Sequence, residues 1–121
     1  FISQNDMGVA LSDTHGCVSK NFISDNEING IYFVYTSFCV VSENVCLNNG
    51  TGIRCLQCDN TLVSGNIFVR GDGTPSDYTS SQYTIYIYSS GQNNLIVGNN
   101  IMGKNYVDNG TNNTFANNKY Q

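Results

Sequence analysis

The chain of 121 residues has the length of one domain. Its formal net charge is -4, charged residues make up only 12% of it, and no basic cluster occurs, so we expect no nucleic-acid partner. No apolar run approaches the ~20 residues that a membrane-spanning helix needs, so we expect no insertion into a membrane.

The sequence repeats itself about every 22 residues, which is typical of a solenoid. The opening segment Phe1–Asp6 returns as Phe22–Glu27. A first apolar series consists of Val9, Ile31, Ile53, Ile85 and Val107. A second series consists of Val18, Val41, Val63, Val97 and Phe115. The first series is expected to point inward, and the members of the second series are expected to line up with one another in successive coils.

Each repeat contains short strand signals. Gly30–Tyr35, Leu62–Phe68 and Thr84–Tyr88 are rich in β-branched and aromatic residues and are bounded by Gly, Asn, Asp and Ser. No segment of helical periodicity is visible. A unit of about three short strands with tight corners predicts one coil of a parallel β-helix. We therefore predict an all-β fold, a parallel β-helix of about five coils, with residues 1–121 forming a single domain.

Asparagine recurs three residues after each member of the second series, at Asn21, Asn44, Asn66, Asn100 and Asn118. Asparagine suits corners because it tolerates left-handed backbone geometry. Stacked asparagines can also bond to one another through their side-chain amides. We predict that these five residues form a ladder along one corner.

The five cysteines are Cys17, Cys39, Cys46, Cys55 and Cys58. By alignment of the repeats, Cys46 and Cys55 should point into the core. Cys55 and Cys58 have the spacing of half a zinc site, but no second pair exists and His15 is the only histidine. We therefore expect no metal site and no cofactor. The odd count favours reduced thiols, with a Cys17–Cys39 disulfide as the alternative. His15 follows an acid without a nucleophile pattern and is expected at a corner.

An insertion of about ten residues lies within residues 71–83, because the step from Ile53 to Ile85 exceeds the repeat. Insertions in solenoids become loops, often on the binding face. The candidate ligand contacts in this loop are Asp72, Asp77 and Tyr78. Asp72 and Asp77 could instead hold calcium or act as an acid–base pair, although the sequence does not define their geometry. A surface loop without function is the plain alternative.

Outward-facing positions next to this loop are also rich in tyrosine. If the first apolar series points inward, the outward residues include Tyr32, Arg54, Tyr86 and Tyr88. Aromatic rings beside an arginine suit a neutral or anionic saccharide, so we predict that this face binds a polysaccharide. The alternative is that tyrosine merely fits a pleated surface.

Two segments carry a family resemblance. The unit Asn21–Ile31 resembles the right-handed parallel β-helix repeats of the pectate-lyase-like superfamily, and the closing segments Asn93–Ile101 and Asp108–Thr114 are similar to those of bacteriophage and prophage tailspike-type proteins. The resemblance implies a carbohydrate-recognition protein at a virion or an extracellular or cell surface. It also implies a homo-oligomer, such as a trimer.

Two other functions stay open at this point. One is a polysaccharide lyase or hydrolase whose catalytic residues lie only partly in this chain, since neither the tandem-Asp motif nor the calcium-binding Asp cluster of the family is matched. The other is a structural β-helix that stacks into a larger assembly. The repeat starts in mid-unit without a cap, so we expect a fragment, or ends that are covered by other subunits.

Overall fold

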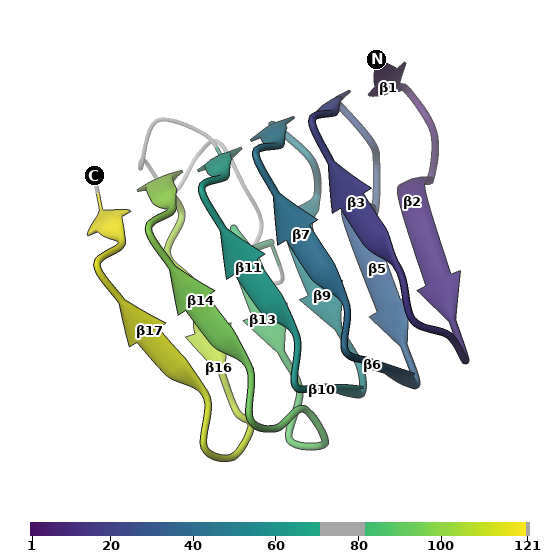
Figure 1. Ribbon diagram of the computed structural model, residues 1–121. Coiled ribbons are helices and arrows are strands. Elements are labelled where there is room, and N and C mark those ends of the chain that lie inside the picture. The colour runs from purple at the N-terminus through teal and green to yellow at the C-terminus, as the bar shows by residue number, and fades with distance from the viewer. Residues whose placement is uncertain (71–81, 121) are drawn as a thin grey trace.

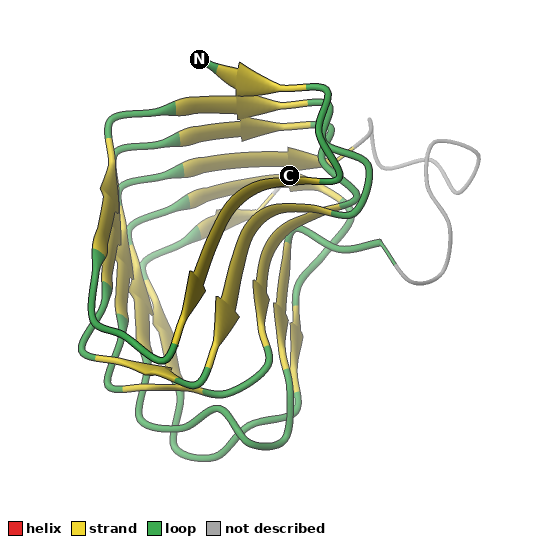
Figure 2. Ribbon diagram, turned by 90° about the vertical axis from the view of Figure 1, so that its right-hand side faces the viewer, coloured by secondary structure: helices red, strands yellow, loops and turns green. Residues whose placement is uncertain are grey.

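The computed structural model describes residues 1–70 and 82–120, and within these ranges the chain consists of strands joined by tight corners (Figures 1 and 2). Three sheets form the walls of a prism. Sheet A contains β1 (Ile2–Ser3), β4 (Phe22–Ser24), β8 (Val45–Leu47), β12 (Ile67–Arg70), β15 (Asn100–Gly103) and β18 (Lys119–Tyr120). Sheet B contains β2 (Met7–Ser12), β5 (Asn29–Val34), β9 (Thr51–Cys55), β13 (Ile85–Ile87) and β16 (Val107–Asp108). Sheet C contains β3 (Cys17–Ser19), β7 (Val40–Ser42), β11 (Leu62–Ser64), β14 (Leu95–Val97) and β17 (Thr114–Ala116). Two short strands, β6 (Thr36–Ser37) and β10 (Cys58–Asp59), pair between sheets B and C.

Neighbouring strands in each sheet come from successive coils and run parallel, for example β5 beside β9 and β11 beside β14. The chain passes from sheet A to sheet B to sheet C and then returns to sheet A one layer further along (Figure 1). The predicted parallel β-helix of about five coils is confirmed.

Ladders of identical or similar side chains fill the interior. Ile31 pairs in register with Val9 on one side and with Ile53 on the other, and Ile53 pairs with Ile85. Ile31, Ile53 and Ile85 are buried. This confirms the first four members of the predicted inward series. Burial of such side chains from water is the main stabilising contribution of the coils.

The last two coils differ from the prediction by one residue. Val63 pairs with Ile96 rather than with Val97, and Ile96 is fully buried. Likewise Tyr86 pairs with Val107, so Val107 lies on the outer face, and Tyr106 packs against the core instead. The predicted alignment of Val97 with Val63 and the predicted inward position of Val107 were wrong, because each valine has an apolar neighbour that fits the interior equally well.

Asparagine ladders line the corners. The backbone amide of Asn44 donates to Oδ1 of Asn66 at 2.9 Å, and the side-chain Nδ2 of Asn44 donates to the same oxygen at 3.0 Å. The same pair of bonds joins each step of the ladder that runs through Asn21, Asn44, Asn66, Asn99 and Asn118. The predicted ladder is therefore confirmed except that Asn99 replaces Asn100. A second ladder joins Asn5, Asn26 and Asn49, and a third leads through Thr61, Asn94 and Asn113.

The residue that precedes a ladder asparagine adopts a left-handed backbone conformation at many corners. Among the described residues, twelve non-glycine residues have a positive φ: Gln4, Asp13, Lys20, Asp25, Tyr35, Phe38, Glu43, Asn48, Asn60, Asn93, Asn112 and Asn117. Asparagine and aspartate tolerate this geometry, whereas bulky residues adopt it at a cost of roughly 1–2 kcal/mol. The two aromatic members, Tyr35 and Phe38, therefore stand in strained positions.

The cysteines follow the predicted directions but not the predicted redox state. Cys46 lies in register between Ile23 and Phe68, and Cys55 lies between Phe33 and Ile87. Cys55 and Cys58 form a disulfide with their Cα atoms 5.7 Å apart, which corrects the expectation that all thiols are reduced. The other thiols are free, with Cys39 and Cys46 buried and Cys17 exposed, so Cys17 and Cys39 are not bonded.

Candidate functional site

The outer face of sheet B carries the row of residues that the sequence predicted. Arg54 on β9 pairs in register with Tyr32 on β5 and with Tyr86 on β13. All three are half-buried. The guanidinium of Arg54 therefore lies in a row between two tyrosines of adjacent strands.

A cluster of three tyrosine rings, here called the tyrosine cluster, stands at the β13 end of this row. The ring centroids of Tyr83 and Tyr86 lie 5.2 Å apart, and those of Tyr86 and Tyr88 lie 4.6 Å apart. The three tilted rings therefore lie next to one another, on β13 and on the residues that flank it. Lys104 Nζ lies 5.1 Å from the centroid of the Tyr83 ring, and Asn109 Nδ2 donates to the Tyr86 hydroxyl at 3.4 Å.

Sequence reasoning missed two members of this surface. Tyr83 stands at the end of the insertion in the sequence, although its ring packs against Tyr86. Lys104 follows Gly103 in the next coil and belongs to no motif. The alternation of tyrosines at Tyr86 and Tyr88 was the signal that identified the face, and extending it back to Tyr83 would have needed the corner geometry.

A groove of about 440 Å³ opens beside Arg54, near the start of the sheet B strands. Its described lining consists of Glu27, Ile28, Gly50, Thr51, Arg54 and Gln82. Among the described residues, the buried Nε atom of Arg54 has no hydrogen-bond partner, and no carboxylate lies within ion-pair distance of this side chain. A buried cationic donor without a partner is costly, so a ligand oxygen could satisfy it.

Arg70 and Gln82 flank the insertion. The Nη2 atom of Arg70 donates to Oε1 of Gln82, which ties the end of β12 to the residue before Tyr83. The candidate contacts Asp72, Asp77 and Tyr78 lie outside the described residues, so their role stays a prediction.

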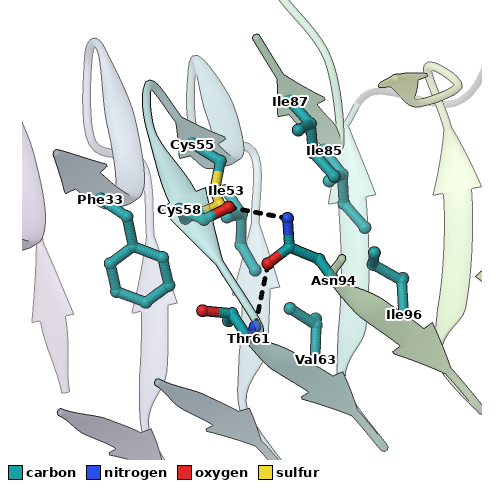
Figure 3. A pocket seen from close by; sticks show the side chains of 10 residues that line it. All are labelled: Phe33, Ile53, Cys55, Cys58, Thr61, Val63, Ile85, Ile87, Asn94 and Ile96. Atoms are coloured by element: carbon teal, nitrogen blue, oxygen red, sulfur yellow. Dashed lines mark hydrogen bonds between the residues drawn. A yellow bond between two sulfur atoms is a disulfide. The ribbon is translucent and has the colours of Figure 1, made fainter. Parts of the chain in front are cut away.

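A cavity in the interior is too small for a ligand. A cavity of about 10 Å³ lies in the core next to the Cys55–Cys58 disulfide, lined mostly by apolar side chains (Figure 3). That volume is at the lower limit for a single water molecule. Within the cavity wall, Asn94 Nδ2 donates to the Cys58 carbonyl at 2.9 Å, and Asn94 Oδ1 accepts from the Thr61 amide at 2.9 Å (Figure 3).

The described part of the chain contains no group of three or more His, Cys, Asp and Glu side chains placed to hold a metal ion. Nor do residues 1–70 and 82–120 include a helix of the length and apolar character that crosses a membrane.

A family model described as "Right handed beta helix region" matches residues 1–120. The chain belongs to the right-handed β-helix family. No curated protein and no solved structure matches this β-helix. The family assignment agrees with the parallel coils and shows that the β-helix is right-handed. It does not identify a ligand.

Proposed function

We propose that this β-helix is a carbohydrate-recognition protein that binds a polysaccharide across the outer face of sheet B. The observation that carries the proposal is the tyrosine cluster beside the Tyr32–Arg54–Tyr86 row. Flat rings at steps of about 5 Å suit the apolar faces of successive sugar rings, by analogy with aromatic pairs.

Arg54 supplies the polar contact in this proposal. Its buried Nε lacks a partner within residues 1–70 and 82–120, and a hydroxyl or carboxylate oxygen of a sugar could accept from it. Asp72, Asp77 and Tyr78 would contribute from the insertion, as the sequence predicts. Each contact is weak, and useful affinity comes from several contacts along a repeating ligand.

The location and assembly of the protein are also proposals. They rest on the resemblance to tailspike-type proteins, which implies a place at a virion or an extracellular or cell surface and a homo-oligomer, such as a trimer. Sedimentation of the purified chain at several concentrations tests the assembly, and a monomer throughout the range would contradict it.

The binding proposal is tested with a glycan array and with the double variant Tyr86→Ala and Tyr88→Ala. Both side chains are half-buried on the outer face, so the fold should survive, as measured by circular dichroism. We expect affinity for the polysaccharide to fall tenfold or more, for a loss of about 1.4 kcal/mol or more. The matched control is Phe22→Ala with Ile67→Ala on the outer face of sheet A, which should leave binding unchanged.

Unchanged binding in the tyrosine variant would overturn the proposed site and favour a structural β-helix that stacks into a larger assembly. Release of reducing ends or of unsaturated products from the bound polysaccharide would instead show a hydrolase or a lyase. In that case the rate of product release and the affinity for the polysaccharide are compared for Arg54→Lys, because lysine keeps the positive charge but lacks the planar set of donors of the guanidinium.

A further inference from the structure

A second groove of about 360 Å³ lies at the corner that follows sheet B in the first two coils. Its lining consists of Asp13, Thr14, His15, Tyr35 and Ser37. The groove of Arg54 lies near the start of β5, whereas this groove lies just past its end. The two are therefore distinct places on the molecule.

The aromatic side chains at this corner stand where the backbone disfavours them. Tyr35 and Phe38 have φ of 54° and 53°, and they are 57% and 67% exposed. The position of Phe38 is taken in the next coils by Asn60, Asn93 and Asn112, which follow the aligned residues Asp59, Gln92 and Thr111. The corner itself requires the left-handed backbone, but it does not require an exposed aromatic side chain there, and strained residues of this kind are concentrated at functional sites.

The histidine of the groove is held in a defined orientation. His15 Nδ1 lies 2.7 Å from the Ser37 carbonyl oxygen, so Nδ1 carries the proton and donates. In the neutral ring Nε2 is then an acceptor. The Phe38 ring supports the imidazole from the side, with centroids 6.1 Å apart.

The lining favours a neutral ligand rich in hydroxyl groups. Asp13 has a second carboxylate oxygen besides the one that accepts the 2.8 Å bond from the Ser12 hydroxyl, and in the neutral ring Nε2 of His15 is a further acceptor. The lining contains neither lysine nor arginine, so an anionic sugar would meet only the charge of Asp13. The Tyr35 ring supplies a face on which a sugar ring can stack.

We propose that the groove between Tyr35 and His15 is a second saccharide site, specific for neutral sugars. The ligand class rests on the proposed function, but the residues and the position do not. Tyr35 stacks on the sugar, Asp13 and His15 accept from its hydroxyls, and Phe38 holds His15 in place.

The test uses ¹⁵N-labelled protein titrated with neutral malto-, cello-, xylo- and N-acetylglucosamine oligomers and, separately, with galacturonan oligomers. At least one neutral series should shift the amide signals of His15, Ser37 and Phe38, and the acidic series should not. Failure of every neutral series to shift these signals overturns the proposal. Shifts at Tyr86 and Arg54 alone would do the same while leaving the proposed function intact.

Two variants test whether the strained aromatic residues are kept for ligand binding at the expense of stability. Tyr35→Asn and Phe38→Asn place a residue suited to left-handed geometry at each corner, so the melting temperature should rise in both. Tyr35→Asn should weaken neutral-sugar binding at least tenfold and Phe38→Asn at least threefold. Phe1→Asn, which replaces an 86% exposed phenylalanine elsewhere, should leave binding unchanged. Full binding by Tyr35→Asn, or a fall in its melting temperature, would overturn the assignment.

The tyrosine double variant separates the two sites. If Tyr86→Ala with Tyr88→Ala keeps the His15 and Phe38 signal shifts but loses polysaccharide affinity, both sites exist. If polysaccharide affinity is unaffected by the double variant but lost in Tyr35→Asn, the proposed face fails and the corner groove stands.

Discussion

Asn66 donates to Oδ1 of Asn99 twice, from its backbone amide at 2.9 Å and from its side-chain Nδ2 at 3.0 Å. Both residues are buried, with 1% of their surface exposed. Each such pair of hydrogen bonds to one oxygen satisfies two donors at a corner that water does not reach. The corners of the β-helix therefore depend on these amides as much as its walls depend on apolar side chains.

Asn99→Ala should destabilise the fold by about 2–3 kcal/mol, because the buried Asn66 amide loses its acceptor. Asn100→Ala is the matched control. The side-chain oxygen of Asn100 accepts no hydrogen bond within the described residues, so its loss should change stability by less than about 0.5 kcal/mol. Urea unfolding followed by circular dichroism measures both, and equal effects would contradict the one-residue register of the ladder.

Gly30→Ala should cost about 1–3 kcal/mol through overpacking. A Cβ atom at Gly30 would lie 2.8 Å from the Gly52 carbonyl oxygen of the next coil and 2.9 Å from Asn49 Nδ2. Gly65→Asn is the control, since Gly65 has a φ of 65°, a Cβ atom there would have no neighbour within 4 Å, and asparagine accepts this geometry. Thermal unfolding should show a clear loss for the first and almost none for the second.

Tyr106→Ala should destabilise the last coil by about 2–3 kcal/mol. The Tyr106 ring stacks on Phe115 with centroids 4.0 Å apart and packs against the core. Val107→Ala should cost less than about 1 kcal/mol, because Val107 faces outward beside Tyr86. The free energies of unfolding compare the two, and a larger loss for Val107→Ala would restore the register that the sequence favoured.

Burial raises the pKa of the Cys46 thiol to about 12, from 9.0 in an unfolded chain. The folded state holds this proton more tightly, so the contribution to stability is complete below pH 9 and is lost as the pH rises from about 9 towards 12. Stability should fall by at most about 1.4 kcal/mol per pH unit in this window through this group. Cys46→Ala lacks the group, so its stability relative to wild type should improve with rising pH.

Thiol labelling gives a second measurement at the same site. At about pH 8, below the ordinary thiol pKa, a maleimide should modify the exposed Cys17 rapidly in the folded protein. Cys46 should react only after unfolding, because its thiol is buried and protonated. Equal labelling rates for the two thiols would show that the coil opens readily at sheet A.

Much of the fold could be predicted because inward residues recur at nearly constant spacing through the first three coils. Val9, Ile31 and Ile53 were assigned correctly by their β-branched character and their period. The register failed where two adjacent residues suit the same position, as in Ile96 and Val97 or Asn99 and Asn100. At such places the residue type does not show which of the two residues occupies the position, and the length of the preceding corner determines it.

The site could be predicted only in part for a related reason. Alternation along a strand identified Tyr32, Arg54 and Tyr86 as outward residues, and the register places them in one row. Contacts across a corner have no such period. The contact of Tyr83 with Tyr86, and the approach of His15 to Ser37, needed the path of the chain in space.

The principal asparagine ladder joins residues that are 23, 22, 33 and 19 positions apart, with nearly the same bond lengths at every step. The geometry of the ladder therefore depends on the spacing between coils and does not depend on the number of residues between two successive asparagines. A foreign peptide could be inserted between two successive ladder asparagines without disturbing the neighbouring coils. The β-helix should therefore accept engineered loops, and the segment between Asn66 and Asn99, which is the longest between two ladder asparagines, is the preferred place to insert one.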